Sequence, residues 1–419
     1  MKKFFVLLCF MFFLHDMSAQ SLLDVYKKGV VKLTPDNEYA QGNQWDKVFE
    51  TYYDATYGNR KSIILMPNGS VVVNHPNRNF YSQFDVNGKF VKEFGITGSS
   101  GKQFQKTNAI AGVINNNFFT GLDNMGKMVC FDFNGNYVKT LTLDYITKGM
   151  IPMINNKIAV VGWVIWKDCF RDFVAIVDYQ TNEQKIIWEH FTARDVNKKQ
   201  LFYYSYGFER GGSIGFTTMP YVRTTGVSLP PKIAFVNDRL IVGLPHNGDI
   251  LTYDVNGKLV SKENIEWGKN YISVEEQKEI QKKAIEKYSD RKNERFTNKI
   301  ISQEENIKML ETIIKQMEED LNKITAPLPI PVFSNIIKDS DGNLLFFEMP
   351  KSDDANKFNV WIYQNGGKFV CQSSFECDDY DLFIAPSRMV FHNGYIYALQ
   401  TLKQADGNPL RLVRFKVGN

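Results

Sequence analysis

Residues 84–91 read Phe-Asp-Val-Asn-Gly-Lys-Phe-Val, and this eight-residue stretch recurs along the chain. Residues 131–138 (Phe-Asp-Phe-Asn-Gly-Asn-Tyr-Val) and 253–260 (Tyr-Asp-Val-Asn-Gly-Lys-Leu-Val) are clear copies, and residues 177–183 and 363–370 are looser ones. Asn-Gly between alternating apolar strands is a strong signal for a β-hairpin, because both residues of a tight hairpin turn need a positive φ. The repeat therefore predicts a series of hairpins.

A second turn, rich in Asn, Asp and Gly, precedes each copy and has apolar strands on both sides. It occurs at residues 67–69, 115–117, 155–157, 237–239, 341–343 and 392–394. Each unit is therefore a strand, a turn, a strand, a loop, a strand, a turn and a strand. Four antiparallel strands that repeat about every 45 residues are typical of the blades of a β-propeller.

The turn at 67–69 and its five counterparts come first in their units, and counting them gives six units. They begin near residues 60, 107, 148, 231, 333 and 384. The sequence therefore predicts an all-β, six-bladed β-propeller. Residues 201–229 contain apolar segments without a comparable pair of turns, so we expect a long connection there, with a seventh blade as the alternative. Because ring closure usually places an N-terminal strand in the last blade, we expect residues 45–53 to supply it.

The composition changes between Gly268 and Pro327, where Glu, Lys, Gln and Ile dominate and neither Gly nor Pro occurs. Ser273 with Glu276, and Ser302 with Glu305, fit capping boxes at helix N-termini. An apolar seam with a spacing of three and four residues follows at Ile307, Leu310, Ile314, Met317, Leu321 and Ile324. This pattern predicts an α-helical hairpin over residues 270–326, inserted within the propeller. The hairpin either buries its seam internally or serves as an arm for self-association or a partner.

The N-terminus has the pattern of a secretory signal peptide. Lys2 and Lys3 precede an apolar run over residues 4–14, and Ser18, Ala19 and Gln20 follow it. We expect residues 1–19 to be removed near Ala19, so that residues 20–419 form the exported propeller in the periplasm, at the cell surface or outside the cell. No later stretch approaches the roughly 20 apolar residues of a transmembrane helix, so no membrane span is expected.

Composition narrows the partners and the redox chemistry. Aromatic residues make up 14% of the chain, which favours strands. The net charge of +4 on 419 residues is too small to indicate a nucleic-acid partner. Four cysteines outside the signal peptide do not make a disulfide scaffold. Cys371 and Cys377 either pair across a turn or remain buried thiols.

The loops between the second and third strands of all units should lie on one face, where propellers usually bind ligands. The candidate ligand-binding residues are His75, Arg78, Asp123, Trp163, Trp166, Lys167, Asp168, Arg171, His246 and Glu348. The histidines at 75 and 246 occupy matching loops, where converging imidazoles would bind a metal or act as a base. Solvated loop histidines are the plainer interpretation. The Trp-rich loop at 163–172 suits stacking of a sugar or aromatic ligand, or simple packing between blades.

One segment carries a family resemblance. Residues 90–95 (Phe-Val-Lys-Glu-Phe-Gly), followed by Gly98, Gly101, Gln103 and Phe104, resemble the NHL-type repeat. The chain as a whole resembles the exported six-bladed, TolB-like propellers of Bacteroidota. This resemblance implies the fold of the blades and does not extend to the helical insertion. Related propellers include lactonases, lyases and binding proteins, so the resemblance does not select an activity.

Two hypotheses of function follow. The first is a binding or scaffold protein of the cell envelope, which presents one propeller face to a protein partner, a small ligand or a glycan. The second is a metal-assisted hydrolase or lyase at the mouth of the propeller channel, centred on His75 and His246. The chain contains no Gly-x-Ser-x-Gly, His-Glu-x-x-His or Cys-x-x-Cys motif, and no sequence motif identifies a cofactor or a metal.

Overall fold

The structure is a computed structural model of the whole chain, and parts of it are described. The described residues are 21–49, 61–75, 80–95, 107–114, 118–123, 126–166, 169–193, 203–210, 213–220, 229–265, 271–293, 302–350, 357–364 and 367–417. The predicted signal peptide and the predicted turn at 115–117 lie outside these ranges.

Four sheets each contain four consecutive antiparallel strands. The first two are β2 (Ser62–Leu65), β3 (Val71–His75), β4 (Phe80–Phe84) and β5 (Phe90–Phe94), then β6 (Thr107–Ile114), β7 (Phe118–Asp123), β8 (Lys127–Asp132) and β9 (Tyr137–Thr142). The next two are β10 (Ile146–Pro152), β11 (Lys157–Trp166), β12 (Cys169–Asp178) and β13 (Gln184–Ala193), then β16 (Lys232–Val236), β17 (Arg239–Leu244), β18 (Asp249–Asp254) and β19 (Leu259–Asn264). This is the strand, turn and loop order that the sequence predicts.

Nine further strands form one sheet. It contains β22 (Phe333–Lys338), β23 (Leu344–Glu348), β24 (Lys357–Gln364), β25 (Lys368–Glu376), β1 (Val31–Pro35), β29 (Leu410–Val417), β28 (Tyr395–Leu402), β27 (Met389–His392) and β26 (Tyr380–Asp381). Strand β1 pairs antiparallel with β29 and, at its start, parallel with β25. It therefore joins two antiparallel halves, β22–β25 and β27–β29.

The closing strand is not the predicted one. We expected residues 45–53 to supply it, but β1 does so, and residues 45–48 form the short helix α3 (Trp45–Val48). In β1, buried and exposed residues alternate at the start, with Val31 and Leu33 inside. In α3, Trp45 stacks on Phe49 with ring centroids 5.5 Å apart, so this segment covers the sheet rather than extending it.

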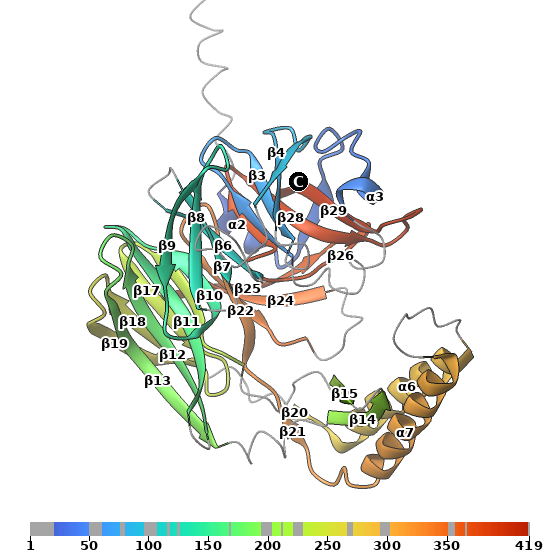
Figure 1. The fold of residues 1–419 in the computed structure, drawn as a ribbon. Helices are drawn as coiled ribbons and strands as arrows, with labels where there is room; N and C mark the ends of the chain where they lie inside the picture. The colour runs from blue at the N-terminus through green and yellow to red at the C-terminus, as the bar shows by residue number, and fades with distance from the viewer. Residues whose placement is uncertain are drawn as a thin grey trace, which may run out of the picture.

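The sheets are arranged as a β-propeller. The first strands β2, β6, β10, β16 and β22 contact one another in that order, and β27 and β28 contact β2. Figure 1 shows the sheets arranged side by side around this inner set of strands. Because neighbouring strands are antiparallel, the β2–β3 and β4–β5 turns lie at one end of their sheet, which we call the turn end. The opposite loop end carries the β3–β4 type of loop.

The repeated Asp of the turn end has a structural role. Its carboxylate accepts hydrogen bonds from the backbone N–H groups two and four residues later, at Asp85, Asp132, Asp254 and Asp339. In the Asn-Gly turns at residues 87–88, 134–135 and 256–257 only the glycine has a positive φ, as at Gly88 (77°), so the expectation that both residues do is wrong there, whereas Asn393 and Gly394 both have a positive φ. A one-residue shift in register after each turn accounts for the difference. Two left-handed residues do occur at Asn155 and Asn156.

Lysines on outer strands tie neighbouring sheets together at the turn end. In three successive pairs, Nζ donates to a backbone carbonyl in the turn of the next sheet: Lys92 to Asn134, Lys139 to Tyr179 and Lys185 to Asn256. Each of these lysines therefore donates a hydrogen bond to the sheet that follows its own. The sequence repeat by itself does not indicate this role.

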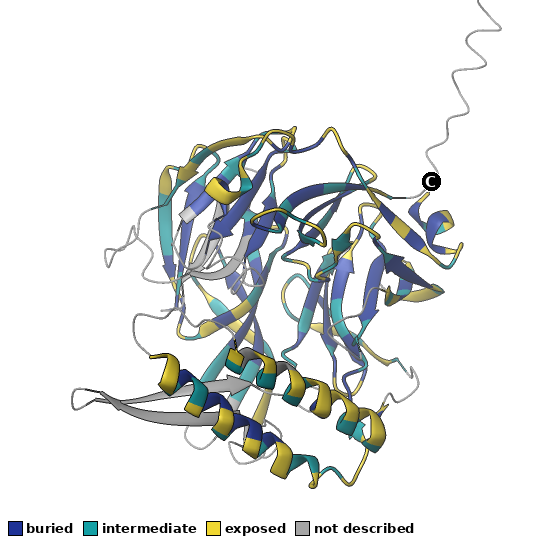
Figure 2. Ribbon diagram, turned by 90° about the vertical axis from the view of Figure 1, so that its right-hand side faces the viewer, coloured by how far each residue is buried: buried dark blue, intermediate teal, exposed yellow. Residues whose placement is uncertain are grey.

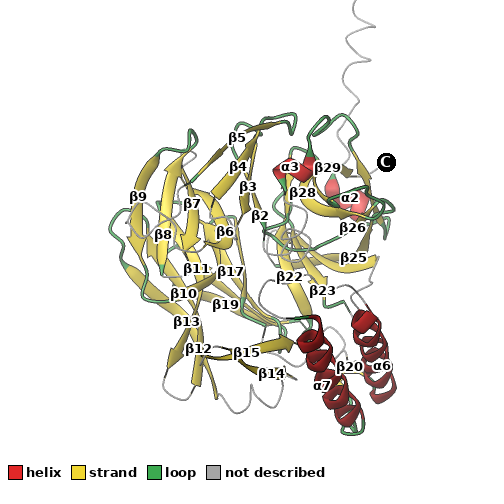
Figure 3. Cartoon of the chain, turned by 45° about the vertical axis from the view of Figure 1, so that its right-hand side comes forward, coloured by secondary structure: helices red, strands yellow, loops and turns green. Residues whose placement is uncertain are grey.

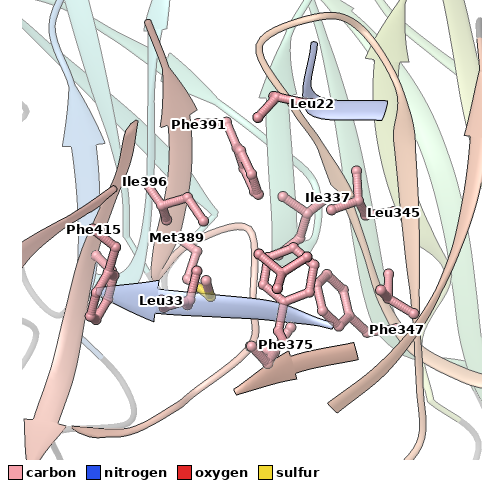
Figure 4. Close-up of a cluster of buried hydrophobic side chains, with 14 of the residues drawn as sticks. Leu22, Leu33, Ile337, Leu345, Phe347, Phe375, Met389, Phe391, Ile396 and Phe415 are labelled. Atoms are coloured by element: carbon pink, nitrogen blue, oxygen red, sulfur yellow. The ribbon is translucent and has the colours of Figure 1, made fainter. Parts of the chain in front are cut away.

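The cores lie between adjacent sheets, and the N-terminus completes one of them. Helix α2 (Leu22–Tyr26) and β1 contribute Leu22 and Leu33 to the cluster that holds Phe347 and Phe375, as Figure 4 shows. The Tyr26 hydroxyl donates to buried Asp339 at 3.1 Å. The N-terminal segment is therefore docked at the seam of the nine-stranded sheet.

Residues 203–220 do not form a seventh blade in the described part of the chain. They contain β14 (Tyr203–Arg210) and β15 (Ser213–Pro220), which pair only with each other in the described sheets. Strand β14 contacts the helix α7 (Gln303–Leu321) of the second insertion. Both insertions leave the propeller from the loop end, after the last strand of a sheet, and Figure 3 shows them on the same side of the molecule.

The second insertion is the predicted helical hairpin. It contains α6 (Val274–Asp290), the short 3-10 helix η2 (Arg291–Asn293) and α7 (Gln303–Leu321), above a stem of β20 (Tyr271–Ile272) and β21 (Leu328–Pro329). Both capping boxes are present. Met309, Ile313 and Met317 pack on Ala284, Ile285 and Tyr288. Of the predicted seam, Leu310, Ile314 and Met317 are buried.

In Figure 2 the strands are mainly buried, whereas the helices are exposed on their outer sides. Among the described helices, none has the length and apolar character required to cross a membrane.

Candidate functional site

His75 differs from its prediction. It is the last residue of β3 rather than an open-loop residue, and it is 1% exposed. Its Nδ1 lies 2.8 Å from Lys61 Nζ, and its Nε2 lies 2.8 Å from Ser82 Oγ. Its ring also packs on Phe49. The position of His75 along its strand places it next to a loop. The alternation of side chains along the strand also turns it to a covered face of the sheet, and its side chain is therefore buried rather than open to solvent.

The predicted pairing of His75 with His246 as metal ligands or as a base stays a prediction. The two belong to the separate sheets β2–β5 and β16–β19. Across the described residues, no group of three or more His, Cys, Asp or Glu side chains is arranged to hold a metal ion.

The remaining predicted residues fall into three groups. Arg78, Lys167 and Asp168 lie outside the described residues. Asp123 and Trp166 are the last residues of β7 and β11, at the loop end as expected, and their side chains are not among those described. The third group, Trp163, Arg171, His246 and Glu348, has described side chains.

Arg171 points away from Trp163. Its Nη2 lies 2.6 Å from Glu189 Oε2, and its guanidinium lies over the rings of Phe173 and Phe191. Phe173 contacts Tyr145, so this face of β12 is turned toward the preceding sheet. The neighbour Asp172 lies on the opposite face, because successive side chains of a strand alternate.

Three side chains form a row across the sheet β10–β13 near the loop end. Trp163 of β11 is opposite Asp172 of β12, and Asp172 is opposite His190 of β13. Directly opposed residues of antiparallel strands share a face. Val161 and Val174, two residues away on this face, belong to the core shared with the sheet β16–β19. The row therefore continues the inter-sheet core toward the loop end with polar groups.

The row has a perturbed carboxylate. Burial raises the pKa of Asp172, while the charges of Lys148 and His190 act in the opposite direction. Lys148 lies at a bulge of β10, and its Nζ lies 5.0 Å from the centre of the Trp163 ring. An acid, an imidazole and an ammonium group thus converge on one tryptophan.

His246 joins this row from the next sheet. It lies in the β17–β18 loop, and part of its surface is exposed. Burial of the rest of the ring lowers its pKa, and the charge of His190 lowers it further. The ring of His190 also stacks on Trp188, with 6.3 Å between centroids. We define Lys148, Trp163, Asp172, His190 and His246 as the rim cluster.

Sequence reasoning selected two members of the rim cluster, Trp163 and His246, and missed the other three. Counting back from the shared turn of β12 and β13 at 179–182 pairs Asp172 with Glu189. A register shift between Val174 and Ala175 places Asp172 opposite His190 instead, so alternation alone does not find this pair. The effect of His190 on His246 depends on how two sheets are packed, and no local pattern encodes it.

A buried lysine was also missed. Lys232 is the first residue of β16, at the loop end of an inner strand. Burial lowers its pKa to about 8. A basic residue within an apolar run, Lys-Ile-Ala-Phe-Val, was the signal for it. It adds a titratable amine to the loop end of the sheet that holds His246.

Glu348 is the last residue of β23 and lies apart from the rim cluster on the sheet β22–β25. Its Oε1 accepts from Trp361 Nε1 at 2.6 Å and from Gln372 Nε2 at 3.3 Å, and its Oε2 accepts from Asn359 Nδ2 at 3.0 Å. The predicted loop-end position is therefore observed, together with a set of neutral donors.

Both cysteines near the C-terminus are free thiols. Cys371 is half-buried, Cys377 is buried, and neither is bonded. Burial raises the pKa of both thiols. Of the two open alternatives, the structure contains the unbonded one.

Comparison with known proteins identifies a shared fold. No family model and no curated protein matches the chain. Among solved structures, a member of the DUF4221 family from Bacteroides vulgatus is 13% identical, with a TM-score of 0.51, and the match covers 93% of this chain and 99% of that one.

Two further solved structures match over most of their lengths at lower scores. An exported protein of Bacteroides fragilis is 12% identical, with 85% of this chain and 90% of that one covered and a TM-score of 0.45. A streptogramin B lyase is also 12% identical, with 85% and 93% covered and a TM-score of 0.37. At these identities the likeness is one of fold. The chain is therefore a β-propeller with the overall fold of a Bacteroides protein.

Proposed function

We propose that this chain is an exported binding protein of the bacterial cell envelope, which holds a ligand or partner at the loop end of a six-bladed propeller. The observation that carries the proposal is the rim cluster. It gathers a desolvated carboxylate, two imidazoles and a lysine around a tryptophan, where two sheets meet. Perturbed ionisable groups concentrate at functional sites more than elsewhere.

The six blades of this proposal follow from a division of the nine-stranded sheet. Each of its halves has a four-strand antiparallel order, β22–β25 and β27–β28–β29–β1. Together with the four separate sheets, this gives one blade for each predicted repeat. The N-terminal strand then closes the last blade.

Export and family membership are parts of the proposal that rest on sequence. The lysines, apolar run and small residues of residues 1–20 support a cleaved signal peptide. The NHL-type segment and the repeat support a place among the TolB-like propellers of Bacteroidota. Periplasm and cell surface are both consistent with these features.

The chemistry of the rim cluster favours binding of a polar ligand. The lowered pKa of His246 leaves its ring neutral at pH 7, so that it offers one donor and one acceptor. Asp172 supplies acceptors, and Trp163 supplies an apolar surface. The insertions β14–β15 and α6–α7 leave the loop end on either side of the sheet that holds His246, so they are placed to contact a bound partner as well.

The test is a thermal-shift screen of residues 20–419 against muropeptides, N-acetylated sugars and dipeptides. We expect at least one class to raise the melting temperature, because a ligand that binds only the folded state stabilises it. Asp172→Asn and His190→Gln should abolish that increase. His392→Gln, a histidine substitution at the turn end, should keep it. No stabilising compound, or a shift that survives both rim substitutions, contradicts the proposal.

The metal-assisted hydrolase or lyase remains the second hypothesis. It is less supported, because the His75 side chain is enclosed by Lys61, Ser82 and Phe49. If it holds, the rim cluster supplies its general base.

A further inference from the structure

We propose that the outer strands of the sheet β22–β25 carry a second binding surface, for a neutral saccharide. The surface consists of Glu348, Asn359, Trp361, Phe369 and Gln372, and we call it the β24 surface. It lies on a different sheet from the rim cluster, so it does not depend on the function proposed there.

The five side chains share one face. Trp361 is opposite Gln372 on β25 and opposite Phe346 on β23. Glu348 and Asn359 are two residues from Phe346 and Trp361 along their strands, and alternation returns them to the same side. Phe369 is opposite Tyr363, two residues beyond Trp361. The sheet register thus brings a carboxylate, two amides and two aromatic rings together.

This face is covered only at its inner strands. Phe346 is buried against the sheet β16–β19, in a core with Ala234 and Ile241. The side chains nearer the outer strands are more exposed. Asn359 and Gln372 are exposed, and Phe369 is 45% exposed. The outer half of the face is therefore accessible to a ligand.

The carboxylate is pre-oriented by neutral donors. Its three hydrogen bonds, from Trp361, Asn359 and Gln372, use one N–H of each donor. A carboxylate has about four lone-pair sites, and each amide also has a carbonyl oxygen and a second N–H. The β24 surface therefore offers acceptors and donors side by side, with the carboxylate fixed in place.

The aromatic rings form a continuous group beside these polar atoms. The centroid of Trp361 lies 5.5 Å from that of Phe369, and Tyr363 lies 5.6 Å from Phe369 and 5.2 Å from Phe346. The buried end anchors the group, so the exposed ring is held in place at little further entropic cost on binding.

This combination matches a saccharide better than a cation. A sugar ring presents an apolar C–H face for stacking and hydroxyls that both donate and accept. A cationic side chain only donates, so the amide N–H groups that surround Glu348 would oppose it. A purely structural role explains the bond from Trp361 to Glu348, but it does not require the exposed ring of Phe369.

The same sequence motif supplies a matched control. Phe90 on β5 occupies the position of Phe369 in the repeat, because each follows Gly-Lys after the last turn of its sheet. It is also partly exposed, at 36%, and packs edge-on to Phe84. No carboxylate is hydrogen-bonded to a tryptophan beside it among the contacts of the described residues. Phe90→Ser removes an equivalent ring without touching the proposed site.

The experiment is isothermal titration of residues 20–419 with hexasaccharides of glucose, mannose, galactose and N-acetylglucosamine, together with trilysine as a cationic probe. We expect one or more hexasaccharides to bind. Glu348→Gln and Phe369→Ser should each weaken binding at least about tenfold, which corresponds to about 1.4 kcal/mol. Phe90→Ser should bind like the unchanged chain. Thermal melting of each variant confirms that it is folded.

Three outcomes overturn the proposal. They are the absence of binding by any hexasaccharide, binding that Glu348→Gln and Phe369→Ser leave intact, and binding of trilysine in place of a sugar. Hexasaccharide binding that is lost in Asp172→Asn and kept in Glu348→Gln would assign the sugar to the rim cluster. That result supports the function proposed there and rejects the β24 surface.

Discussion

The turn end and the loop end of the propeller are built from the same strands but differ in almost every other respect. At the turn end, one arrangement recurs, with an aspartate that accepts two backbone N–H groups and a glycine with positive φ. At the loop end, the described connections differ from one another. One extends into the β14–β15 ribbon, another into the α6–α7 hairpin, and a third carries His246.

This difference indicates that the turn end serves the stability of the fold and that the loop end serves its function. A turn that repeats in each sheet serves the fold, because each sheet needs the same hairpins and the same ties to its neighbour. Loops that vary on a constant scaffold are where binding residues are usually placed. The pKa values differ between individual carboxylates rather than between the ends. Asp132 at the turn end has a lowered pKa, because its hydrogen bonds from Asn136, Asn134 and Gly135 outweigh burial, whereas burial prevails at Asp172 and at turn-end Asp339.

The largest effect is expected at Asp339, a buried turn-end aspartate that also holds the N-terminal segment. It is 2% exposed and accepts from Tyr26, from the Asn343 side chain and from two backbone N–H groups. Asp339→Ala should lower the free energy of unfolding by about 3 kcal/mol, since it leaves buried donors without an acceptor. Urea denaturation measures this loss. The neighbouring Asp341→Ala removes only one hydrogen bond to the N-terminal segment, from Leu22 N at 3.3 Å, so it should cost less; an equal loss in both variants would rule out a special role for Asp339.

A smaller loss is expected at an ordinary turn. Asp132→Ala removes the acceptor for Asn134 and Asn136, which should cost about 1 kcal/mol. Because the folded-state pKa of Asp132 is lowered, its contribution is present above the unfolded-state pKa and disappears as the pH falls through the folded-state pKa. The difference between Asp132→Ala and the unchanged chain should therefore shrink in acid. Asp144→Ala, at the exposed β9–β10 connection, should have no such effect in either condition.

The smallest effect, and one of opposite sign, is expected at the loop end. The folded-state pKa of Asp172 is raised, so its charged form opposes folding at neutral pH and this penalty vanishes below the unfolded-state pKa. Asp172→Asn should therefore stabilise the protein at pH 7 by less than about 1 kcal/mol. At pH 3 the gain should be absent. Destabilisation by Asp172→Asn at pH 7 would place Asp172 with the structural carboxylates and remove the contrast between the two ends.

Some of this could be read from the sequence, and the reasons are local. The repeat of residues 84–91 predicted the hairpins, because turn residues act on backbone atoms within four positions. Ser302 and Glu305 predicted the start of α7 for the same reason. The closing strand was misplaced because Val31–Pro35 and residues 45–53 are both short apolar segments, and only pairing with β29 distinguishes them.

The candidate site shows the same limit more sharply. Trp163 and Glu348 were expected at the loop end and lie there, because strand order fixes the end at which a residue emerges. His75 was also expected to present its side chain at the loop end, but that side chain is enclosed by Lys61 and Phe49. Strand order does not say which face is covered.

By itself the sequence determined the alternation, the turns and the helix caps of this protein, and from them the propeller fold. Each of these depends on residues a few positions apart, whose distances are set by covalent geometry. The tertiary structure alone decided that β1 closes the last sheet, that the charge of His190 acts on His246 in the next sheet, and that Glu348 is surrounded by Trp361, Asn359 and Gln372. These contacts arise only when whole sheets pack against each other, because their partners are separated by strand registers and sheet faces that no local pattern specifies.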